Sequence, residues 1–370
     1  MEAMGIIFSN IYDSSMGELT GERTSAAIPF AGRYRQIDFA LSSMASAGIR
    51  HIGIITKTNY ESLMNHLGSC QEWDLTLEDV GVVLLPPYAI GHTGIYRGKL
   101  EALYSALNVL KNAKQDYVVL SDTTVLAAVD YKDALRKHIA SGKDITILTK
   151  KMNGNGRKYL MAVECGDDLT PTDMIADYTI NGVMDISMGM FIISRQRLIE
   201  AIEATVPHGK YHFERDFILE GFNCGSLSIG VYPFEKTALF NESLIEYYEN
   251  SMKLFDENVR RDLFHSEIPI YTKTRNEVPT FYGDRAQVAE CIIADGCSIH
   301  GACRRSVLFR EAKIESDAAI ENCVVMQGCT VGRGAQLQNV ILDKDVVIKP
   351  YTKLNGSAEH PLYIKKGATV

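Results

Sequence analysis

The sequence has no run of about 18 or more apolar residues, the length that a transmembrane helix requires. Residues 1–9 also lack the basic and long apolar regions of a secretory signal peptide. Positive charge is not in excess either, since 38 Lys and Arg are outnumbered by 46 Asp and Glu, for a formal net charge of −8. These absences argue against membrane insertion, secretion and general nucleic-acid binding, for which a basic face is expected. We therefore expect a cytoplasmic protein that holds any anionic ligand with a local cluster of cations.

The composition is that of an ordinary globular protein, with 370 residues, 46% hydrophobic and 23% charged. This length favours two domains, or one large domain with an appendage. Eight cysteines occur in a long chain without a secretory signal, so we expect reduced, buried thiols rather than disulfides.

Up to about residue 150, short apolar runs alternate with amphipathic stretches, a pattern typical of βαβ units in a largely parallel, doubly wound sheet. Residues 98–113 are expected to form one helix, because Leu100, Leu103 and Leu107 fall on one face. The expected strands are 5–8, 51–56, 82–85, 117–120, 144–148, 160–165, 188–193 and 228–232, and further helices are expected at 195–204, 212–221 and 242–255.

Near the end of the chain the apolar residues recur every six positions. A helix cannot explain this period, since six residues advance an α-helix by about 600° and would scatter the apolar residues over several faces. Three six-residue faces per turn instead predict a triangular, left-handed parallel β-helix of hexapeptide repeats. The triplet Leu308, Ile314 and Ile320 recurs 17 residues later as Val325, Val331 and Leu337, then as Leu342, Ile348 and Leu354, and one shift backwards reaches Cys291, Cys297 and Cys303.

These patterns divide the chain into three parts. Residues 1–255 are expected to form the α/β domain, and 286–370 the β-helix. The polar, irregular stretch 256–285 is expected to link them.

Local motifs then connect the chain with a known family. The segment 28–42, IPFAGRYRQIDFALS, resembles the PFGGKYRIIDFALS signature of bacterial ADP-glucose pyrophosphorylases. The motifs 96–98, YRG, and 187–189, SMG, follow in the same order and at comparable spacing, and the β-helix comes last. The resemblance covers nearly the whole chain. It implies a Rossmann-like, GT-A-like nucleotidyltransferase domain before the β-helix, and a role in making ADP-glucose from ATP and glucose 1-phosphate for glycogen.

That chemistry needs a glycine loop around the triphosphate, cations on the transferred group and carboxylates on magnesium. The family's glycine loop corresponds here to residues 10–15, which contain no glycine, and Ser15 stands where the family has an arginine. Close approach of backbone N–H groups to phosphate is therefore lost. Ser25 replaces the phosphate-binding lysine of the family's RAKPA motif, and the EKP lysine that holds the sugar phosphate is missing before Ser187.

The magnesium ligands are also incomplete. Asp122 matches the family's first metal aspartate and follows the 117–120 strand, where open α/β sheets place ligands, although a role as a helix N-cap is an alternative. Phe240 stands at the second metal aspartate, and an aromatic ring cannot bind magnesium. Each lost electrostatic contact typically costs about 10²–10³ in rate, so several together would leave little catalysis. We expect no catalytic residue, metal or cofactor in this chain alone, with Mg²⁺ carried by a catalytic partner subunit.

Three groups of residues are the candidates for binding. By resemblance, the YRG motif approaches the nucleotide, although it could simply be a turn that opens the next helix. A cluster of arginines on an otherwise acidic protein could hold a phosphorylated effector, or could be a solvated basic face. The nucleotide-site candidates are Tyr96, Arg97, Gly98 and Asp122, the sugar-site candidates are Ser187 and Gly189, and the effector-site candidates are Arg23, Arg33 and Arg35.

We therefore expect a regulatory, non-catalytic member of this family, the GlgD type. By resemblance it joins a catalytic homologue in a heterotetramer and modulates it allosterically, with self-association as a further option. An active sugar-1-phosphate nucleotidyltransferase with rearranged ligands is the main alternative. A hexapeptide-repeat acyltransferase using His300 is more remote, because that histidine has no evident partner and the α/β domain would have no purpose.

Overall fold

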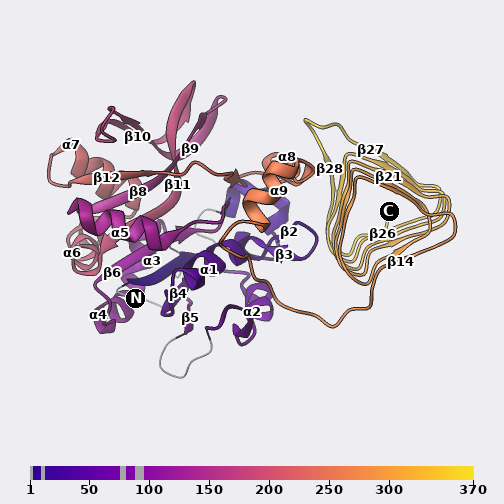
Figure 1. The fold of residues 1–370 in the computed structure, drawn as a ribbon, viewed down its shortest axis with the longest axis horizontal. Helices are drawn as coiled ribbons and strands as arrows, with labels where there is room; N and C mark the ends of the chain where they lie inside the picture. Colours follow the sequence, from indigo (N-terminus) through magenta and orange to yellow (C-terminus); the bar gives the residue numbers. More distant parts are fainter. Residues whose placement is uncertain (1–2, 10–12, 76–80, 88–95) are drawn as a thin grey trace.

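The computed structural model describes residues 3–9, 13–75, 81–87 and 96–370. A mixed α/β domain occupies one side of the molecule and a triangular coil the other, as Figure 1 shows. Within the described residues, no helix combines the length and the apolar character needed to cross a bilayer.

The α/β domain is built on one nine-stranded sheet. Four strands pair in parallel, as expected from the alternating pattern: β1 (Ala3–Phe8), β4 (Ile52–Ile55), β5 (Val82–Leu85) and β6 (Tyr117–Asp122). β11 (Val183–Ser194) instead runs antiparallel to β6, to β8 (Ile145–Asn153) and to β9 (Arg157–Cys165), so the parallel order holds for only part of the sheet. The strands follow the order β10 (Pro171–Ile180), β9 (Arg157–Cys165), β11 (Val183–Ser194), β6 (Tyr117–Asp122), β1 (Ala3–Phe8), β4 (Ile52–Ile55) and β5 (Val82–Leu85), with β8 (Ile145–Asn153) joining β11 to β12 (Ile229–Pro233).

Helices cover both faces of this sheet (Figure 1). The single helix expected over 98–113 is divided at Ala106 into α3 (Lys99–Ser105) and α4 (Leu107–Asn112). The helix expected at 212–221 is a π-helix, η5 (Phe213–Leu219), followed by a short α7 (Glu220–Asn223). The other helices are η1 (Asp13–Thr20), η2 (Ser25–Ala27), α1 (Gln36–Ser46), α2 (Glu61–Leu67), η3 (Gln71–Trp73), α5 (Tyr131–Ser141), α6 (Arg195–Thr205), η4 (Val206–His208), α8 (Leu244–Lys253) and α9 (Glu257–Phe264), and two small sheets pair β2 (Pro29–Phe30) with β3 (Tyr34–Arg35) and β7 (Val125–Leu126) with β13 (Leu239–Phe240).

The C-terminal part is a left-handed parallel β-helix made of three five-stranded sheets, one on each side of the triangle in Figure 1. The first sheet contains β14 (Phe281–Tyr282), β17 (Ser298–Ile299), β20 (Lys313–Ile314), β23 (Thr330–Val331) and β26 (Val347–Ile348). The second contains β15 (Gln287–Ala289), β18 (Ala302–Arg304), β21 (Ala319–Glu321), β24 (Gln336–Gln338) and β27 (Lys353–Asn355). The third contains β16 (Ile292–Ile293), β19 (Val307–Leu308), β22 (Val324–Val325), β25 (Val340–Leu342) and β28 (Leu362–Ile364).

The strand register confirms the predicted stacking except at its beginning. Val325 pairs with Leu308 on one side and with Leu342 on the other, 17 residues away in each direction. The shift back to Cys291 and Cys297 is wrong, because Leu308 pairs with Ile293. The coil is two residues shorter there: Gly301 makes a tight corner in which an added Cβ would lie 2.3 Å from the carbonyl oxygen of Ala318.

All eight cysteines are free thiols, as expected. Burial is less uniform than predicted, because Cys224 is exposed and Cys165 and Cys291 are half-buried. The five buried thiols are Cys70, Cys297, Cys303, Cys323 and Cys329.

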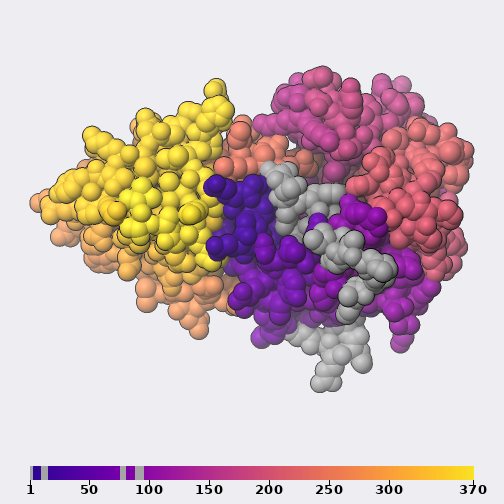
Figure 2. All heavy atoms as spheres, turned by 180° about the vertical axis from the view of Figure 1, so that it is seen from behind, coloured from indigo at the N-terminus to yellow at the C-terminus, as the bar shows by residue number. Residues whose placement is uncertain are grey.

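The junction between the two parts is a packed interface. The stretch 256–285 contains α9, and β14 near its end already pairs with β17 of the β-helix. Figure 2 shows early residues, in indigo, against the last coils, in yellow. Arg23 and Asp343 join these segments in a buried ion pair, with Arg23 Nη2 2.8 Å from Asp343 Oδ1. An apolar cluster that includes Phe30, Phe309 and Ile341 continues across the same boundary.

Candidate functional site

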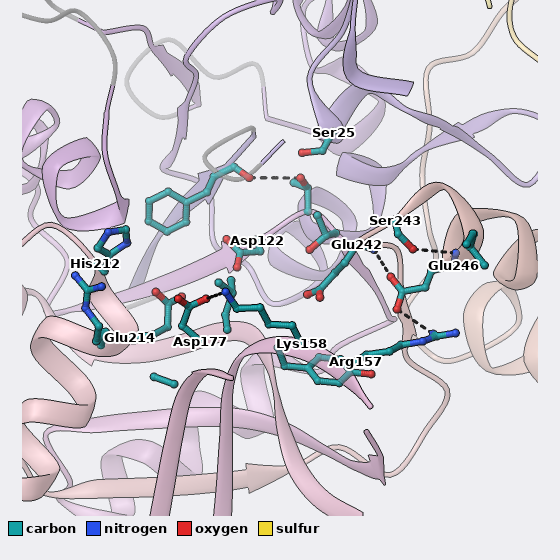
Figure 3. A pocket seen from close by; sticks show the side chains of 18 residues that line it. Ser25, Asp122, Arg157, Lys158, Asp177, His212, Glu214, Glu242, Ser243 and Glu246 are labelled. Carbon is teal, nitrogen blue, oxygen red and sulfur yellow. Dashed lines mark hydrogen bonds and ion pairs between the residues drawn. The ribbon is translucent and has the colours of Figure 1, made fainter. Parts of the chain in front are cut away.

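A cleft of about 580 Å³ opens where β1 and β6 end, and Figure 3 shows the side chains that line it. This is the edge at which parallel α/β sheets hold their ligands. Among the described residues, five acidic side chains line the cleft: Asp122, Asp177, Glu214, Glu242 and Glu246. The lysine and arginine side chains that line it are Arg157, Lys158 and Arg215.

Asp122 lies at the end of β6 and is held by a buried lysine. Lys99, the first residue of α3, is fully buried, and its Nζ lies 2.6 Å from Asp122 Oδ2. The same ammonium forms an ion pair with Glu214 on η5. Burial raises the pKa of Asp122 to about 6, and the Lys99 charge opposes this shift. The predicted position of Asp122 is thus at the cleft, but its carboxylate is occupied by a partner that the sequence patterns did not reveal.

Gly189 and Ser187, the sugar-site candidates, form a bulge in β11 against Asp122. Gly189 has φ +67°, and an added Cβ would lie 2.3 Å from Asp122 Oδ2. Only glycine tolerates both the left-handed backbone and this approach. The hydroxyl of Ser187 accepts a hydrogen bond from the Gly189 N–H at 3.2 Å. Both residues therefore support Asp122 from behind.

Two of the degenerate positions, Ser25 and Phe240, are part of the protein packing. Ser25 is buried at the cleft, and its hydroxyl donates to the carbonyl oxygen of Ser9 at 2.8 Å. Phe240 on β13 is buried, with its ring centroid 6.0 Å from that of Tyr159. Residues 13–15 of the expected loop begin η1, and residues 10–12 fall outside the described residues.

The YRG motif forms the turn that precedes α3. This is the alternative role considered for it above. An added Cβ on Gly98 would lie 2.3 Å from the carbonyl oxygen of Tyr211, so the chain passes very close here. Arg97 lies over the Tyr211 ring, 3.5 Å from its centroid, and pairs with Glu101 at 2.7 Å. The hydroxyl of Tyr96 is 2.8 Å from Ser105 Oγ.

The cations that line the cleft have acidic partners. Lys158 lies 2.7 Å from Asp177, and Figure 3 marks this pair. Arg157 bridges Glu246 and Glu249 on α8, at 2.9 and 3.0 Å. These pairs leave the cleft with an acidic surface.

Glu242 is an acidic residue of the cleft that the sequence reasoning missed. Burial and the charge of Glu246 raise its pKa to about 8, so the neutral form is present at neutral pH. Its position two residues after Phe240 was the only signal available, because nothing in the pattern separates it from other acidic residues before a helix.

A magnesium ion, which the resemblance implies, does not fit these residues. Asp122 is engaged by Lys99, and the second expected position is the buried ring of Phe240. Across the described ranges, no cluster of three or more His, Cys, Asp or Glu side chains is arranged to hold a metal ion.

A second, smaller pocket lies at the junction between the α/β domain and the β-helix. It is strongly cationic, and none of the described residues that line it is acidic. Burial lowers the pKa of Lys344 to about 7, and the nearby guanidinium of Arg35 acts in the same direction. Arg310 Nε is buried without a hydrogen-bond partner among the described residues. The basic residues that line the pocket are Arg33, Arg35, His66, Lys273, Arg275, Arg310 and Lys344.

This pocket contains two of the three arginines expected to form an effector site. Arg33 is exposed at its edge, whereas Arg35 is buried and donates to the carbonyl oxygen of Ala27 at 2.9 Å. Arg23 does not line the pocket, because its guanidinium pairs with Asp343. His300, the remote acyltransferase candidate, lies against the ring of Phe281 on the first coil.

Comparison with known proteins agrees with this architecture. The family described as "Nucleotidyl transferase" matches residues 14–159, and "GlmU-like, C-terminal hexapeptide" matches residues 277–360. The glycogen biosynthesis protein GlgD of Bacillus subtilis (strain 168) is 32% identical over 99% of this chain and 96% of its own length. The protein of the same name from Geobacillus stearothermophilus is 33% identical over 98% of this chain and 96% of its own length.

Relatives named as enzymes are somewhat more distant. A glucose-1-phosphate adenylyltransferase of Bacillus thuringiensis (strain Al Hakam) is 29% identical over 92% of this chain and 91% of its own length. Similarity at this level over nearly the full chain, with both domains matched, shows common descent. The chain therefore belongs to the ADP-glucose pyrophosphorylase family, as a relative of the GlgD glycogen biosynthesis proteins.

Proposed function

We propose that this chain is a regulatory, catalytically deficient subunit of ADP-glucose pyrophosphorylase. It joins a catalytic homologue that makes ADP-glucose from ATP and glucose 1-phosphate for glycogen, and it modulates the activity of that homologue. The catalytic homologue supplies the Mg²⁺ site, whereas this chain supplies contacts and effector binding.

The distribution of cations carries this proposal. A triphosphate and a sugar phosphate are polyanions, and their transfer requires cations aimed at the reacting group. In the cleft that should hold them, the lysine and arginine side chains pair with carboxylates: Lys158 with Asp177, and Arg157 with Glu246. The cations gather instead in the pocket at the domain junction, where no acidic residue of the described part of the chain lines the walls. Charge thus favours anion binding at a regulatory position and opposes it at the catalytic one.

The junction pocket connects both domains, which suits an allosteric effector. Arg33 comes from the α/β domain, Lys273 from the stretch between the domains, and Lys344 from the β-helix. A phosphorylated metabolite bound there would neutralise all three and would favour the arrangement that brings them closest together. An effector changes activity only if it binds one arrangement more tightly than another, and a ligand shared by two domains meets this requirement.

We place the contact with the catalytic homologue at the open first coil of the β-helix. Within the described ranges, no further coil covers the outer side of β14 and β15, and Phe281, Tyr282 and Val288 are exposed there. Open strand edges and exposed apolar side chains favour association with another chain. The enzyme relative from Bacillus thuringiensis matches 92% of this chain, so its homologous coil is a fitting occupant.

Two measurements test the catalytic and regulatory parts. The purified chain, given ATP, glucose 1-phosphate and Mg²⁺, should release no pyrophosphate above the buffer rate, and robust turnover would support the active nucleotidyltransferase instead. Co-expression with a catalytic glucose-1-phosphate adenylyltransferase should give a complex with the mass of a heterotetramer and altered kinetics. Separate elution of the two chains, with unchanged kinetics on mixing, would contradict the proposal.

Matched variants test the two surfaces. Arg33→Ala with Lys344→Ala should weaken the response of the mixed enzyme to a phosphorylated activator at least several-fold. Lys132→Ala, which removes an exposed lysine of α5, is the control and should leave that response unchanged. Phe281→Ser with Tyr282→Ser should dissociate the complex, whereas Val183→Ser, at another exposed apolar residue, should not. If Phe281→Ser with Tyr282→Ser leaves the complex intact, the first coil is excluded as the interface.

A further inference from the structure

A buried lysine, Lys99, lies behind the acidic side chains of the cleft. The Lys99 side chain is fully buried behind Asp122 and Glu214, which line the cleft: its ammonium lies 2.6 Å from Asp122 Oδ2 and forms an ion pair with Glu214. The rings of Phe8 and Phe191 lie 5.5 and 5.7 Å from Nζ. A buried lysine is stable only when its charge is paired, and here two carboxylates from distant segments satisfy it.

The carboxylate that Lys99 holds is the one that the family resemblance assigns to a metal ion. Asp122 follows β6 at the edge of the sheet where ligands bind. Gly189 lies so close behind it that even a Cβ would approach Oδ2 to 2.3 Å. The oxygen that Lys99 binds therefore lies against Gly189, which has no side chain, and the ion pair occupies the space that a larger residue would fill.

A divalent cation and the ammonium compete for the same two carboxylates, of which Asp122 Oδ2 and Glu214 Oε1 already lie against Nζ. Magnesium binds through one or two carboxylates at about 2.0–2.1 Å and keeps several waters. With Nζ 2.6 Å from Oδ2, a metal ion on that oxygen would lie next to a positive charge in a buried site. Glu214, the other carboxylate within reach of Nζ, is occupied in the same way.

We propose that the Lys99 ammonium has replaced the divalent cation of the cleft, so that this protein holds Asp122 and Glu214 with a tethered charge in place of Mg²⁺. The two carboxylates form a latent divalent-cation site that opens only when Lys99 is removed. The inference deepens the proposed loss of catalysis, because it names the residue that closes the metal site. It also predicts that the fold of the cleft does not depend on metal.

Direct measurement of metal binding tests the idea. Mn²⁺ titration, followed by the electron paramagnetic resonance signal of the free ion, should show no binding in the cleft of the unmodified protein at submillimolar Mn²⁺. Lys99→Ala should bind one Mn²⁺ at least tenfold more tightly, and Lys99→Ala with Asp122→Asn should lose this gain. Lys158→Ala is the matched control, because it removes another lysine that lines the cleft and pairs with an acid.

The same titration on the unmodified protein keeps the test independent of folding. If Lys99→Ala does not fold, Mn²⁺ binding by the unmodified chain that Asp122→Asn abolishes would still overturn the proposal. Lys99→Ala that folds and binds no Mn²⁺ would overturn it as well. Metal binding and pyrophosphate release are separate readouts, so the unmodified protein could bind Mn²⁺ without turnover. That result would refute the role of Lys99 and leave the regulatory function standing.

Discussion

The ion pair between Arg23 and Asp343 makes a quantitative prediction about the domain junction. We expect Arg23→Met to destabilise the protein, because it leaves the Asp343 carboxylate buried without its cation. Both side chains are only 3% exposed, and Arg23 Nη2 lies 2.8 and 2.9 Å from the two carboxylate oxygens. Methionine keeps much of the length of arginine, so the change removes charge more than volume.

The size of the loss follows from what remains around Asp343. Removing one partner of a buried ion pair typically costs about 3–5 kcal/mol. The hydroxyl of Tyr363 still donates to Asp343 at 2.6 Å, as does the Lys344 N–H at 2.7 Å. These bonds keep the carboxylate partly satisfied, so we expect the lower end of the range, about 3 kcal/mol. For 370 residues unfolding together, this lowers Tm by about 4 °C.

Thermal unfolding and urea denaturation, followed by far-UV circular dichroism, measure this change. Arg23→Met with Asp343→Asn should recover at least half of the loss, because the uncompensated charge is then gone. Arg33→Met is the control, since this exposed arginine should change stability by less than about 0.5 kcal/mol. A loss below about 1 kcal/mol in Arg23→Met, or a double variant as unstable as the sum of the singles, would refute the reasoning.

Three further predictions concern the cleft and the pocket. Ser25→Lys with Phe240→Asp should not restore pyrophosphate release, because the glycine loop is still absent; substantial turnover would show that the loop matters less than we argue. Binding of sulfate, a dianion at both pH 6 and pH 8, at the junction pocket should weaken several-fold over this range, as Lys344, with a pKa of about 7, loses its proton. Lys344→Met should flatten that titration in calorimetry, and an unchanged profile would exclude this lysine. Gly189→Ala should destabilise the chain by about 2 kcal/mol or more, through its positive φ and the contact with Asp122; unchanged urea denaturation would contradict this.

The β-helix could be predicted almost residue by residue, because each coil places apolar side chains at the same inward positions. Leu308, Val325 and Leu342 stack as their spacing requires. The predicted pairing of Cys291 with Leu308 is wrong because the corner at Gly301 is two residues shorter than the equivalent corners of the later coils. The six-residue spacing of the apolar residues before and after that corner does not reveal the shortening. Hydrophobic spacing does not contain that information.

Less of the α/β domain could be predicted. β10 has mostly exposed or half-buried residues, so it lacks the apolar run that identified the central strands. Asp122 can be predicted because it follows a buried strand, whereas the sequence does not distinguish Lys99 from any other polar residue of an amphipathic helix. Its burial depends on Asp122 and Glu214, which are 23 and 115 positions away in the chain. Such a contact is a property of the tertiary structure, and the local sequence does not specify it.

The Arg23–Asp343 pair also has a consequence for biosynthesis. Its two members are separated by 320 positions, so Arg23 leaves the ribosome long before Asp343 has been made. The α/β domain can form while the chain is being translated, since domains generally fold as units from the N-terminus. The surface around Arg23 remains exposed to solvent until the last coils leave the ribosome. The domain junction therefore cannot close before synthesis of the last coils, however early the α/β domain folds.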